Sequence, residues 1–239
     1  MKEKLYTIPV NEGFEKDCEC PVCSMVITLE NNAIDFTMGP SYMEDDVREA
    51  TSRLGFCEKH IHKLYKHQNR LGLALILMSH VDKIIKDTKK LSSSKIPSSS
   101  FFKKKTDSSE LASYYDKLDG SCYICENINN TLERYVATIF HLYHNEESFR
   151  NKFKASKGFC TEHYKILYDA SSKYLRGSEQ AQFLETLNKL YLDNMERVRE
   201  DLSWFIDKFD YRYADEPWKN SKDALPRTIE KINSINPID

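Results

Sequence analysis

Two sets of three cysteines and one histidine occur in this chain, about a hundred residues apart. Each set is a CxxC pair followed by a GFCxxH pair: Cys20, Cys23, Cys57 and His60 in the first, and Cys122, Cys125, Cys160 and His163 in the second. The step from the CxxC pair to the next cysteine is 34 residues in the first set and 35 in the second. Three thiols and one imidazole are the ligands of a closed tetrahedral zinc site. The matched spacing therefore predicts an internal repeat that binds two zinc ions.

Each pair spans three positions, which places its two ligands on one face of a helix. A thiolate at a helix N-terminus is stabilised by free backbone N–H groups and by the helix dipole. We expect each set to hold its own ion, closing a loop of about 34 residues. A structural zinc contributes about 10–16 kcal/mol to folding, which suits a helical half that is too small to bury a large core.

Other chemistries use the same residue types. An iron–sulfur cluster with a histidine ligand stays open, although the spacing matches no ferredoxin pattern. A redox-active CxxC is disfavoured because no βαβ pattern accompanies it, and haem attachment requires CxxCH, whereas Ser24 and Glu126 occupy the histidine positions. Catalytic zinc keeps an open coordination position, which four strong ligands would fill. The seventh cysteine, Cys18, has no counterpart in the second set; it is a surface thiol, a competing ligand or a redox-sensitive thiol.

The pattern of apolar residues predicts an all-α fold. Seven glycines and seven prolines in 239 residues are few for a sheet-rich protein, and no stretch alternates convincingly at period two. We expect two tandem metal-stapled helical repeats, at 1–91 and 111–206. A flexible Ser- and Lys-rich linker at 92–110 joins them, and a C-terminal segment at 207–239 wraps around the bundle.

Each repeat shows the same order of helices. The helix after the first CxxC ends before Gly39, and short polar helices follow at 44–53 and 146–154. Gly55 and Gly158 then occupy tight turns before the GFCxxH pair opens the next helix. In the first repeat we expect this helix to be long, marked by Ile61, Leu64, Leu71, Leu75, Met78 and Ile85.

The segment 209–232 is unusually dense in charged and aromatic residues. One interpretation is a tail anchored by aromatic rings and ion pairs, ending in a helix from about 225 to 232. A second is a segment that orders on binding a protein partner. A third is the wall of a ligand pocket beside one metal site, lined by Asp210, Arg212, Trp218, Asp223 and Arg227.

Composition narrows the partners and the location. The formal net charge is −2, and no basic helix face is present, so we expect no binding to nucleic acid. The longest apolar run, residues 71–78, is too short to span a bilayer, and the first residues carry no signal-peptide pattern. We therefore expect a cytoplasmic protein, where a reducing environment favours metal binding over disulfides. The oligomeric state is left open.

The combined motifs resemble a protein family. The CPVC…GFCEKH and CYIC…GFCTEH repeat, followed by FDYR and EPWKNSKDALPR, is similar to a family of uncharacterised bacterial proteins, mainly from anaerobic Gram-positive species. The similarity covers nearly the whole chain and implies a cytoplasmic bacterial protein. It implies no activity, because none is established for the family.

Two hypotheses for function follow from the residues. The first is a non-catalytic interaction or regulatory scaffold with two structural zinc sites, since no GxSxG, P-loop or HExxH motif is present. The second is an enzyme or small-ligand sensor, with a pocket between the repeats that the C-terminal segment completes. The partner is accordingly a protein or a small ligand, and the sequence does not choose between them.

Overall fold

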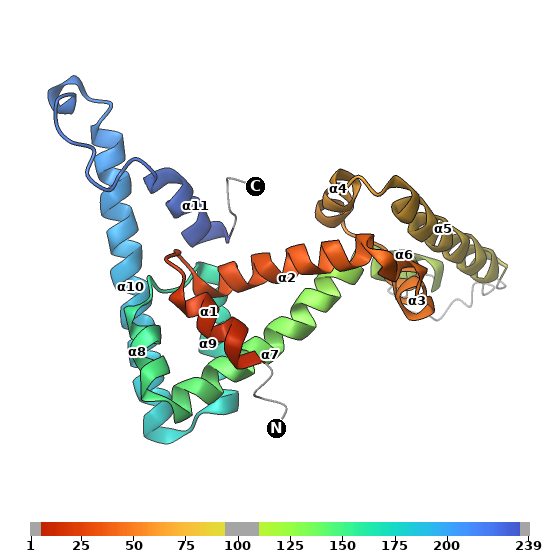
Figure 1. Ribbon diagram of the computed structural model, residues 1–239, viewed down its shortest axis with the longest axis horizontal. Helices are drawn as coiled ribbons and strands as arrows, with labels where there is room; N and C mark the ends of the chain where they lie inside the picture. Colours follow the sequence, from red (N-terminus) through yellow and green to blue (C-terminus); the bar gives the residue numbers. More distant parts are fainter. Residues whose placement is uncertain (1–5, 94–109, 235–239) are drawn as a thin grey trace, which may run out of the picture. The chain divides into compact units, whose positions relative to one another are not determined.

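The computed structural model describes residues 6–93 and 110–234, and within these ranges the chain is entirely helical (Figure 1). This confirms the predicted all-α fold. The α-helices are α1 (Thr7–Glu15), α2 (Pro21–Met38), α3 (Asp45–Leu54), α4 (Glu58–Lys66), α5 (Arg70–Ser92), α6 (Glu110–Asp119), α7 (Tyr123–Asn145), α8 (Glu147–Ala155), α9 (Thr161–Tyr174), α10 (Gly177–Asp207) and α11 (Ala224–Asn233). Two short 3-10 helices are η2 (Pro40–Met43) and η3 (Tyr211–Tyr213).

The chain divides into two compact units. Unit 1 comprises Met1–Thr28 and Leu132–Asp239, and unit 2 comprises Leu29–Thr131. The boundaries fall inside α2 and α7, so both helices contribute residues to both units. The predicted division into repeats at 1–91 and 111–206 remains a prediction about the sequence. The linker predicted at 92–110 lies mostly outside the described residues, although Ser92 ends α5 and Glu110 begins α6.

Unit 1 is built around an aromatic core. Helices α9, α10 and α11 pack against one another, and α1 packs against α8. The rings of Phe153 and Phe183 lie at the centre, 5.5 Å apart. They are surrounded by other buried rings from four parts of the unit: Phe14, Phe140, Phe149 and Phe159. Rings of this size bury a large apolar area, which stabilises the helices that carry the unit's metal ligands.

Unit 2 has a smaller aliphatic core. Ile34, Met38, Leu64 and Leu73 pack together between α2, α4 and α5. Asn69 joins these helices, because its side chain donates to Met38 O and accepts from Gly72 N at the start of α5. These contacts hold α2, α4 and α5 of unit 2 together.

The prediction of one long helix after the first GFCxxH pair is wrong. The chain breaks between α4 and α5, where Gln68 adopts a left-handed conformation with φ of 69°. Asn69 then caps the N-terminus of α5, as asparagine favours this position. The predicted stripe is therefore divided between two helices: Leu64 is buried, whereas its α5 members are exposed, namely Leu71, Leu75, Met78 and Ile85.

The predicted turns are confirmed. Helix α2 ends at Met38, before Gly39 and Pro40. Gly55 and Gly158 follow α3 and α8 with φ of 60° and 76°, a region that favours glycine. At Gly55 the space is also limited, since a Cβ would lie 2.6 Å from the His80 ring. These turns place the GFCxxH cysteines at the starts of α4 and α9. Among the described residues, no helix is long and apolar enough to cross a bilayer.

Candidate metal centres

The eight predicted ligands form two groups, each containing three thiols and one imidazole. In each group the four ligand atoms all lie within 4.8 Å of one another. Metal group 1, in unit 1, consists of Cys20, Cys23, Cys160 and His163. Metal group 2, in unit 2, consists of Cys57, His60, Cys122 and Cys125.

The predicted assignment of one ion to each sequence set is therefore wrong. Each group combines the CxxC pair of one set with the GFCxxH pair of the other. The reason lies in the helices that follow the CxxC pairs. Helix α2 has 18 residues and is about 27 Å long, so its far end lies well away from Cys23. For Cys57 to reach Cys20 and Cys23, α3 would have to run back along α2, but α3 packs against η2 and α5 instead.

The same reasoning applies to the second set. Helix α7 has 23 residues and is about 35 Å long, whereas α8 has 9 residues and spans about 14 Å. Helix α8 packs against α1. Cys160 is thereby brought to Cys23, from which it is separated by 137 residues along the chain. In metal group 2, Cys57 and Cys125 are 68 residues apart in sequence.

All four ligand pairs lie at helix N-termini, as predicted. The two CxxC pairs begin α2 and α7, and Cys57 and Cys160 are the N-cap residues of α4 and α9. In metal group 1, backbone N–H groups point at the sulfurs: His163 N lies 3.4 Å from Cys160 Sγ, and Cys23 N lies 3.4 Å from Cys20 Sγ. Such N–H groups and the helix dipole stabilise thiolates.

The histidines present the same nitrogen in both groups. In metal group 1, His163 Nδ1 lies 3.1 Å from Cys160 Sγ, 3.3 Å from Cys23 Sγ and 3.5 Å from Cys20 Sγ. In metal group 2, His60 Nδ1 lies 3.2–3.3 Å from the three sulfurs. Each imidazole therefore directs Nδ1 at the thiols and leaves Nε2 for another partner. Metal group 1 is fully buried, whereas Cys57 and Cys125 of metal group 2 are partly exposed.

The thiols in each group shift one another's pKa. Burial raises the pKa of Cys125 to about 12, with a further contribution from the charge on Cys122. For Cys122 burial acts in the same direction, but the hydrogen bond with His60 and nearby N–H groups lower its pKa to about 6. In metal group 1, hydrogen bonds with Cys160 and Cys20 raise the pKa of Cys23, whereas the pKa of Cys160 is lowered. Ionisation of Cys23 and Cys125 near neutral pH therefore requires a bound cation.

A buried glutamate orients the histidine of metal group 2. Glu30 Oε1 lies 2.9 Å from His60 Nε2, and the carboxylate also pairs with Lys59 at 2.8 Å and Lys63 at 2.9 Å. The hydrogen bond with His60, followed by those with the lysines, holds the pKa of Glu30 well below its usual range although burial opposes this. A carboxylate on the outer nitrogen fixes the tautomer of a metal-binding imidazole. Glu30 was not among the predicted site residues, and its only signal in the sequence is its place two helical turns after Cys23.

We expect Glu30→Gln to weaken zinc binding at metal group 2 by about 10- to 100-fold, because glutamine keeps the shape of the side chain but loses its charge. Competition with a chromophoric chelator measures this affinity. Glu49→Gln, at an exposed site on α3 of the same unit, is the control and should leave the affinity unchanged. The ion of metal group 1 should be unaffected in both variants. Equal affinities for the Glu30→Gln variant and the unaltered protein would show that the carboxylate does not act on the metal.

The two loops of metal group 2 are joined by direct hydrogen bonds. Tyr123 N donates to Gly55 O at 3.0 Å, and Ser121 Oγ donates to Leu54 O at 2.6 Å. The first bond links a residue inside CYIC to the first residue of GFCEKH, and the second links the residues immediately before these two motifs. They hold the two ligand pairs together in addition to any metal ion.

Metal group 1 lacks the donors for the equivalent bonds. Pro21 takes the place of Tyr123 and has no N–H group, and Glu19 takes the place of the serine. Lys231 of α11 provides the missing donor, since its Nζ donates to Glu19 O and to Lys157 O at 2.5 Å each. The C-terminal helix thus joins the two ligand loops of metal group 1.

Lys231 is part of a buried charged cluster. It is fully buried and lies 3.2 Å from the carboxylate of Glu19, to which Arg197 also donates at 2.5 Å. Burial lowers the pKa of Lys231, and the charge of Glu19 opposes this shift. Ser234, just after α11, lies with its Oγ 2.9 Å from Cys160 Sγ. These residues were not predicted from the sequence, because no spacing relates them to the ligand pairs.

The remaining cysteine and histidines lie outside both metal groups. Burial raises the pKa of the Cys18 thiol to about 11, with a further contribution from the charge of Cys20, which makes it a poor nucleophile. Three histidines have other partners: His80 lies 2.7 Å from Ser52 O, His67 pairs with an aspartate, and His144 pairs with a glutamate.

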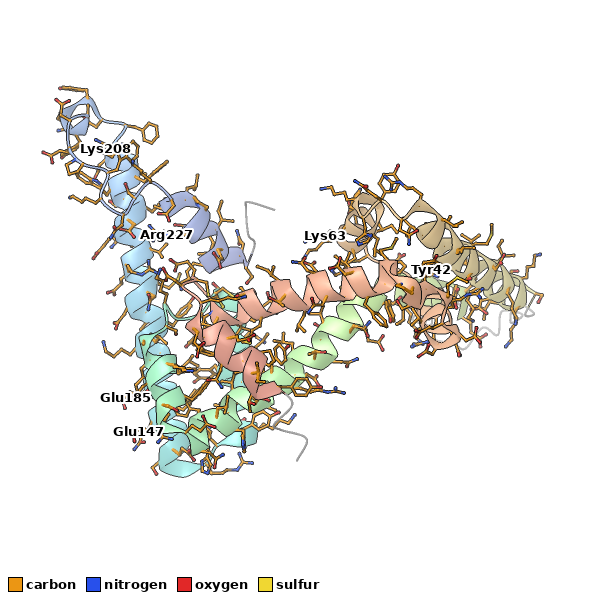
Figure 2. The ribbon with its side chains drawn as sticks, in the orientation of Figure 1. Tyr42, Lys63, Glu147, Glu185, Lys208 and Arg227 are labelled. Atoms are coloured by element: carbon orange, nitrogen blue, oxygen red, sulfur yellow. The ribbon has the colours of Figure 1, made fainter. Side chains whose placement is uncertain are left out.

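The five residues predicted to line a ligand pocket divide into two sets. Asp223 and Arg227 line a pocket of about 500 Å³ in unit 1. Asp210 and Arg212 pair with each other at 2.7 Å on the surface, and Trp218 packs against Phe205 and Lys208. Figure 2 labels Arg227 on α11, whose guanidinium reaches Asp201 of α10. The C-terminal segment therefore wraps unit 1 and also contributes to a pocket.

A family model matches the chain over residues 1–239. Its description is "Family of unknown function (DUF6062)", and the chain belongs to this family. No curated protein and no solved structure matches the chain.

Proposed function

We propose that this member of the DUF6062 family is a non-catalytic zinc-binding scaffold, which acts by interaction or regulation. The supporting observation is that each metal group supplies four strong protein ligands. A structural zinc site has this closed set, whereas a catalytic site keeps one position for water or substrate. The role of the ions is then to hold helix N-termini from distant parts of the chain together. A cytoplasmic location in a bacterium, where the thiols stay reduced, suits this proposal.

The separations between ligand atoms support a single ion in each group. Zinc–sulfur bonds of about 2.3 Å and zinc–nitrogen bonds of about 2.0–2.1 Å give tetrahedral edges of about 3.8 Å between sulfurs and about 3.6 Å between sulfur and nitrogen. The sulfur–sulfur separations include 3.5 Å for Cys23–Cys160 and 3.9 Å for Cys57–Cys125. An iron–sulfur cluster distributes its ligands over several iron atoms and would separate them more widely. Zinc is therefore favoured over a cluster.

We expect purified protein to contain two zinc ions per chain and to be colourless. Elemental analysis gives the stoichiometry, and replacement by cobalt gives the absorption of tetrahedral thiolate coordination. Metal group 2 should lose its ion to a chelator first, because two of its cysteines are partly exposed. Brown protein containing iron and sulfide would contradict the assignment to zinc. A cobalt spectrum that changes when small anions are added would indicate an open position, and would contradict a closed structural role.

The alternative is an enzyme or a small-ligand sensor. Its support is the pocket of about 500 Å³ that Asp223 and Arg227 help to line in unit 1. Turnover would require a reactive group directed at this pocket. The ion pairs among the residues of this pocket favour a role in ligand binding over a role in catalysis.

A further inference from the structure

A pocket of about 500 Å³ in unit 1 is lined mainly by cations. Its lining comes from Lys157, from the C-terminal part of α10, from the loop at 217–223 and from the start of α11. The cations that line it are Lys157, Arg197, Lys219, Lys222 and Arg227. Its volume falls within the range of about 300–1,000 Å³ that is typical of small-molecule sites.

The lining of the pocket carries five cations and only two carboxylates. Asp201 and Asp223 both pair with Arg227, at 2.9 Å and 3.0 Å. The lining therefore has an excess of three positive charges, while Glu19 and Asp17, which lie outside the lining, pair with Arg197 and Lys157. Like charges gathered in a concave site raise the local potential, and a bound anion would relieve their repulsion.

Residues outside the pocket lining hold the Arg197 side chain in place. One of its terminal nitrogens donates to the buried carboxylate of Glu19 at 2.5 Å, and its Nε donates to Asn194 Oδ1 at 3.0 Å. A guanidinium with several N–H groups can meet further oxygen atoms through its remaining donors. Lys157 pairs with Asp17 on the surface, and such exposed pairs contribute little stability and break readily.

The loop that carries Lys219 and Lys222 is anchored by its own contacts. Ser221, between them, is fully buried and donates to Trp218 O at 2.7 Å. Trp204 of α10 donates to Pro217 O at 3.0 Å, and the Lys219 ammonium lies 3.7 Å from the centre of the Trp204 ring. Lys219 itself is in the left-handed region with φ of 52°, which is uncommon outside glycine.

The start of this loop is held by Lys208. Its ammonium donates to three backbone carbonyls, those of Tyr213, Ala214 and Glu216, at 2.5–2.8 Å. Lys208 is labelled in Figure 2 at the end of α10, beside the loop. Side-chain contacts to its backbone thus fix the loop before and between the two lysines. A preorganised loop loses less entropy when a ligand binds.

We propose that this pocket binds a small phosphate-bearing anion, with Arg197 as the fixed guanidinium and Lys157, Lys219 and Lys222 as the ammonium groups. Guanidinium and ammonium groups are the usual partners of phosphate oxygens. The excess of positive charge favours a polyanion over a singly charged carboxylate. The inference does not depend on the role of the zinc ions, and it gives the sensor alternative a ligand class.

Isothermal titration with pyrophosphate tests the proposal in the full-length, zinc-loaded protein at constant ionic strength. We expect saturable binding with a Kd below about 1 mM, and two retained zinc ions per chain after the titration. Succinate, a dicarboxylate, should bind at least tenfold more weakly. Binding without saturation, or equal affinity for succinate, would overturn the proposal.

A pair of matched variants locates the site. The double variant Lys219→Gln/Lys222→Gln should bind pyrophosphate at least tenfold more weakly. It breaks no ion pair among the described residues, although it removes the contact of the Lys219 ammonium with the Trp204 ring. Lys165→Gln/Lys189→Gln removes the same charge from exposed positions outside this pocket, and should bind with unchanged affinity. Equal weakening in both double variants would show attraction to overall charge alone and would reject a defined site.

Discussion

Removal of all four ligands of metal group 1 is expected to leave one zinc ion per chain. The variant carries four substitutions: Cys20→Ser, Cys23→Ser, Cys160→Ser and His163→Asn. Metal group 2 is complete without these residues, since its four ligand atoms come from other positions and lie within 4.8 Å of one another. Native mass spectrometry gives the number of bound ions directly.

A second variant with four substitutions removes the first sequence set instead, and it keeps Cys20→Ser and Cys23→Ser. Cys57→Ser and His60→Asn replace the substitutions at Cys160 and His163, so this variant also loses three cysteines and one histidine. It takes two ligands from each metal group, and we expect it to retain no tightly bound zinc. If each sequence set held its own ion, the two variants would show the reverse pattern. The difference is a whole ion per chain, the largest effect expected from any substitution in this protein.

A measurement on the unaltered protein guards against unfolding of the variants. In cadmium-substituted protein, NMR couplings connect each metal ion to the protons of its ligands. We expect one cadmium ion to couple to both Cys23 and Cys160, and the other to both Cys57 and Cys125. Coupling of one ion to Cys23 and Cys57 would refute the exchanged pairing.

The ligand residues could be predicted from the sequence, but their pairing could not. Two CxxC pairs and two GFCxxH pairs can combine in two ways, and both combinations give chemically equivalent Cys₃His sets. The choice depends on where α3 and α8 pack after α2 and α7, and these are contacts between segments far apart in sequence. The exchanged pairing closes longer loops in the chain. Each doubling of loop length costs about 0.6 kcal/mol of closure entropy, a small term beside the binding free energy of zinc.

The helices show where local pattern suffices. Gly55 and Gly158 mark turns that depend only on neighbouring residues, and both were predicted. The apolar residues after His60 have helical spacing throughout, yet Gln68 and Asn69 divide them into α4 and α5. Only these two residues signal the break between the helices, whereas the spacing of the apolar residues indicates one continuous helix. Lys231 has no signal of this kind, because its partners are backbone carbonyls brought to it by the fold.

Lys231→Met is expected to lower the free energy of unfolding by about 3–5 kcal/mol, the usual cost of removing one partner from a buried charged pair. The change leaves the carboxylate of Glu19, which is also buried, with one fewer cation. It also leaves Glu19 O and Lys157 O without their donor. Denaturant unfolding measures the loss. Lys189→Met, at an exposed i,i+4 pair on α10, should change stability by less than about 0.5 kcal/mol.

A second readout separates a specific link to metal group 1 from general destabilisation. Lys231 joins the loops before Cys20 and Cys160, so Lys231→Met should speed release of that ion to a chelator and leave metal group 2 unaffected. Equal acceleration at both metal groups would show that the lysine acts through global stability alone.

Pro21→Ala in the Lys231→Met background tests why the lysine is required. Alanine restores an N–H group at the position where Tyr123 N bonds to Gly55 O in metal group 2. The corresponding acceptor in metal group 1 is Gly158 O, and one recovered hydrogen bond should return about 1 kcal/mol. Slower zinc release in the double variant than in Lys231→Met alone would show that α11 substitutes for a bond that proline removes. If the double variant releases zinc as fast as the single one, the lysine acts through the charge of Glu19 and not through the loops.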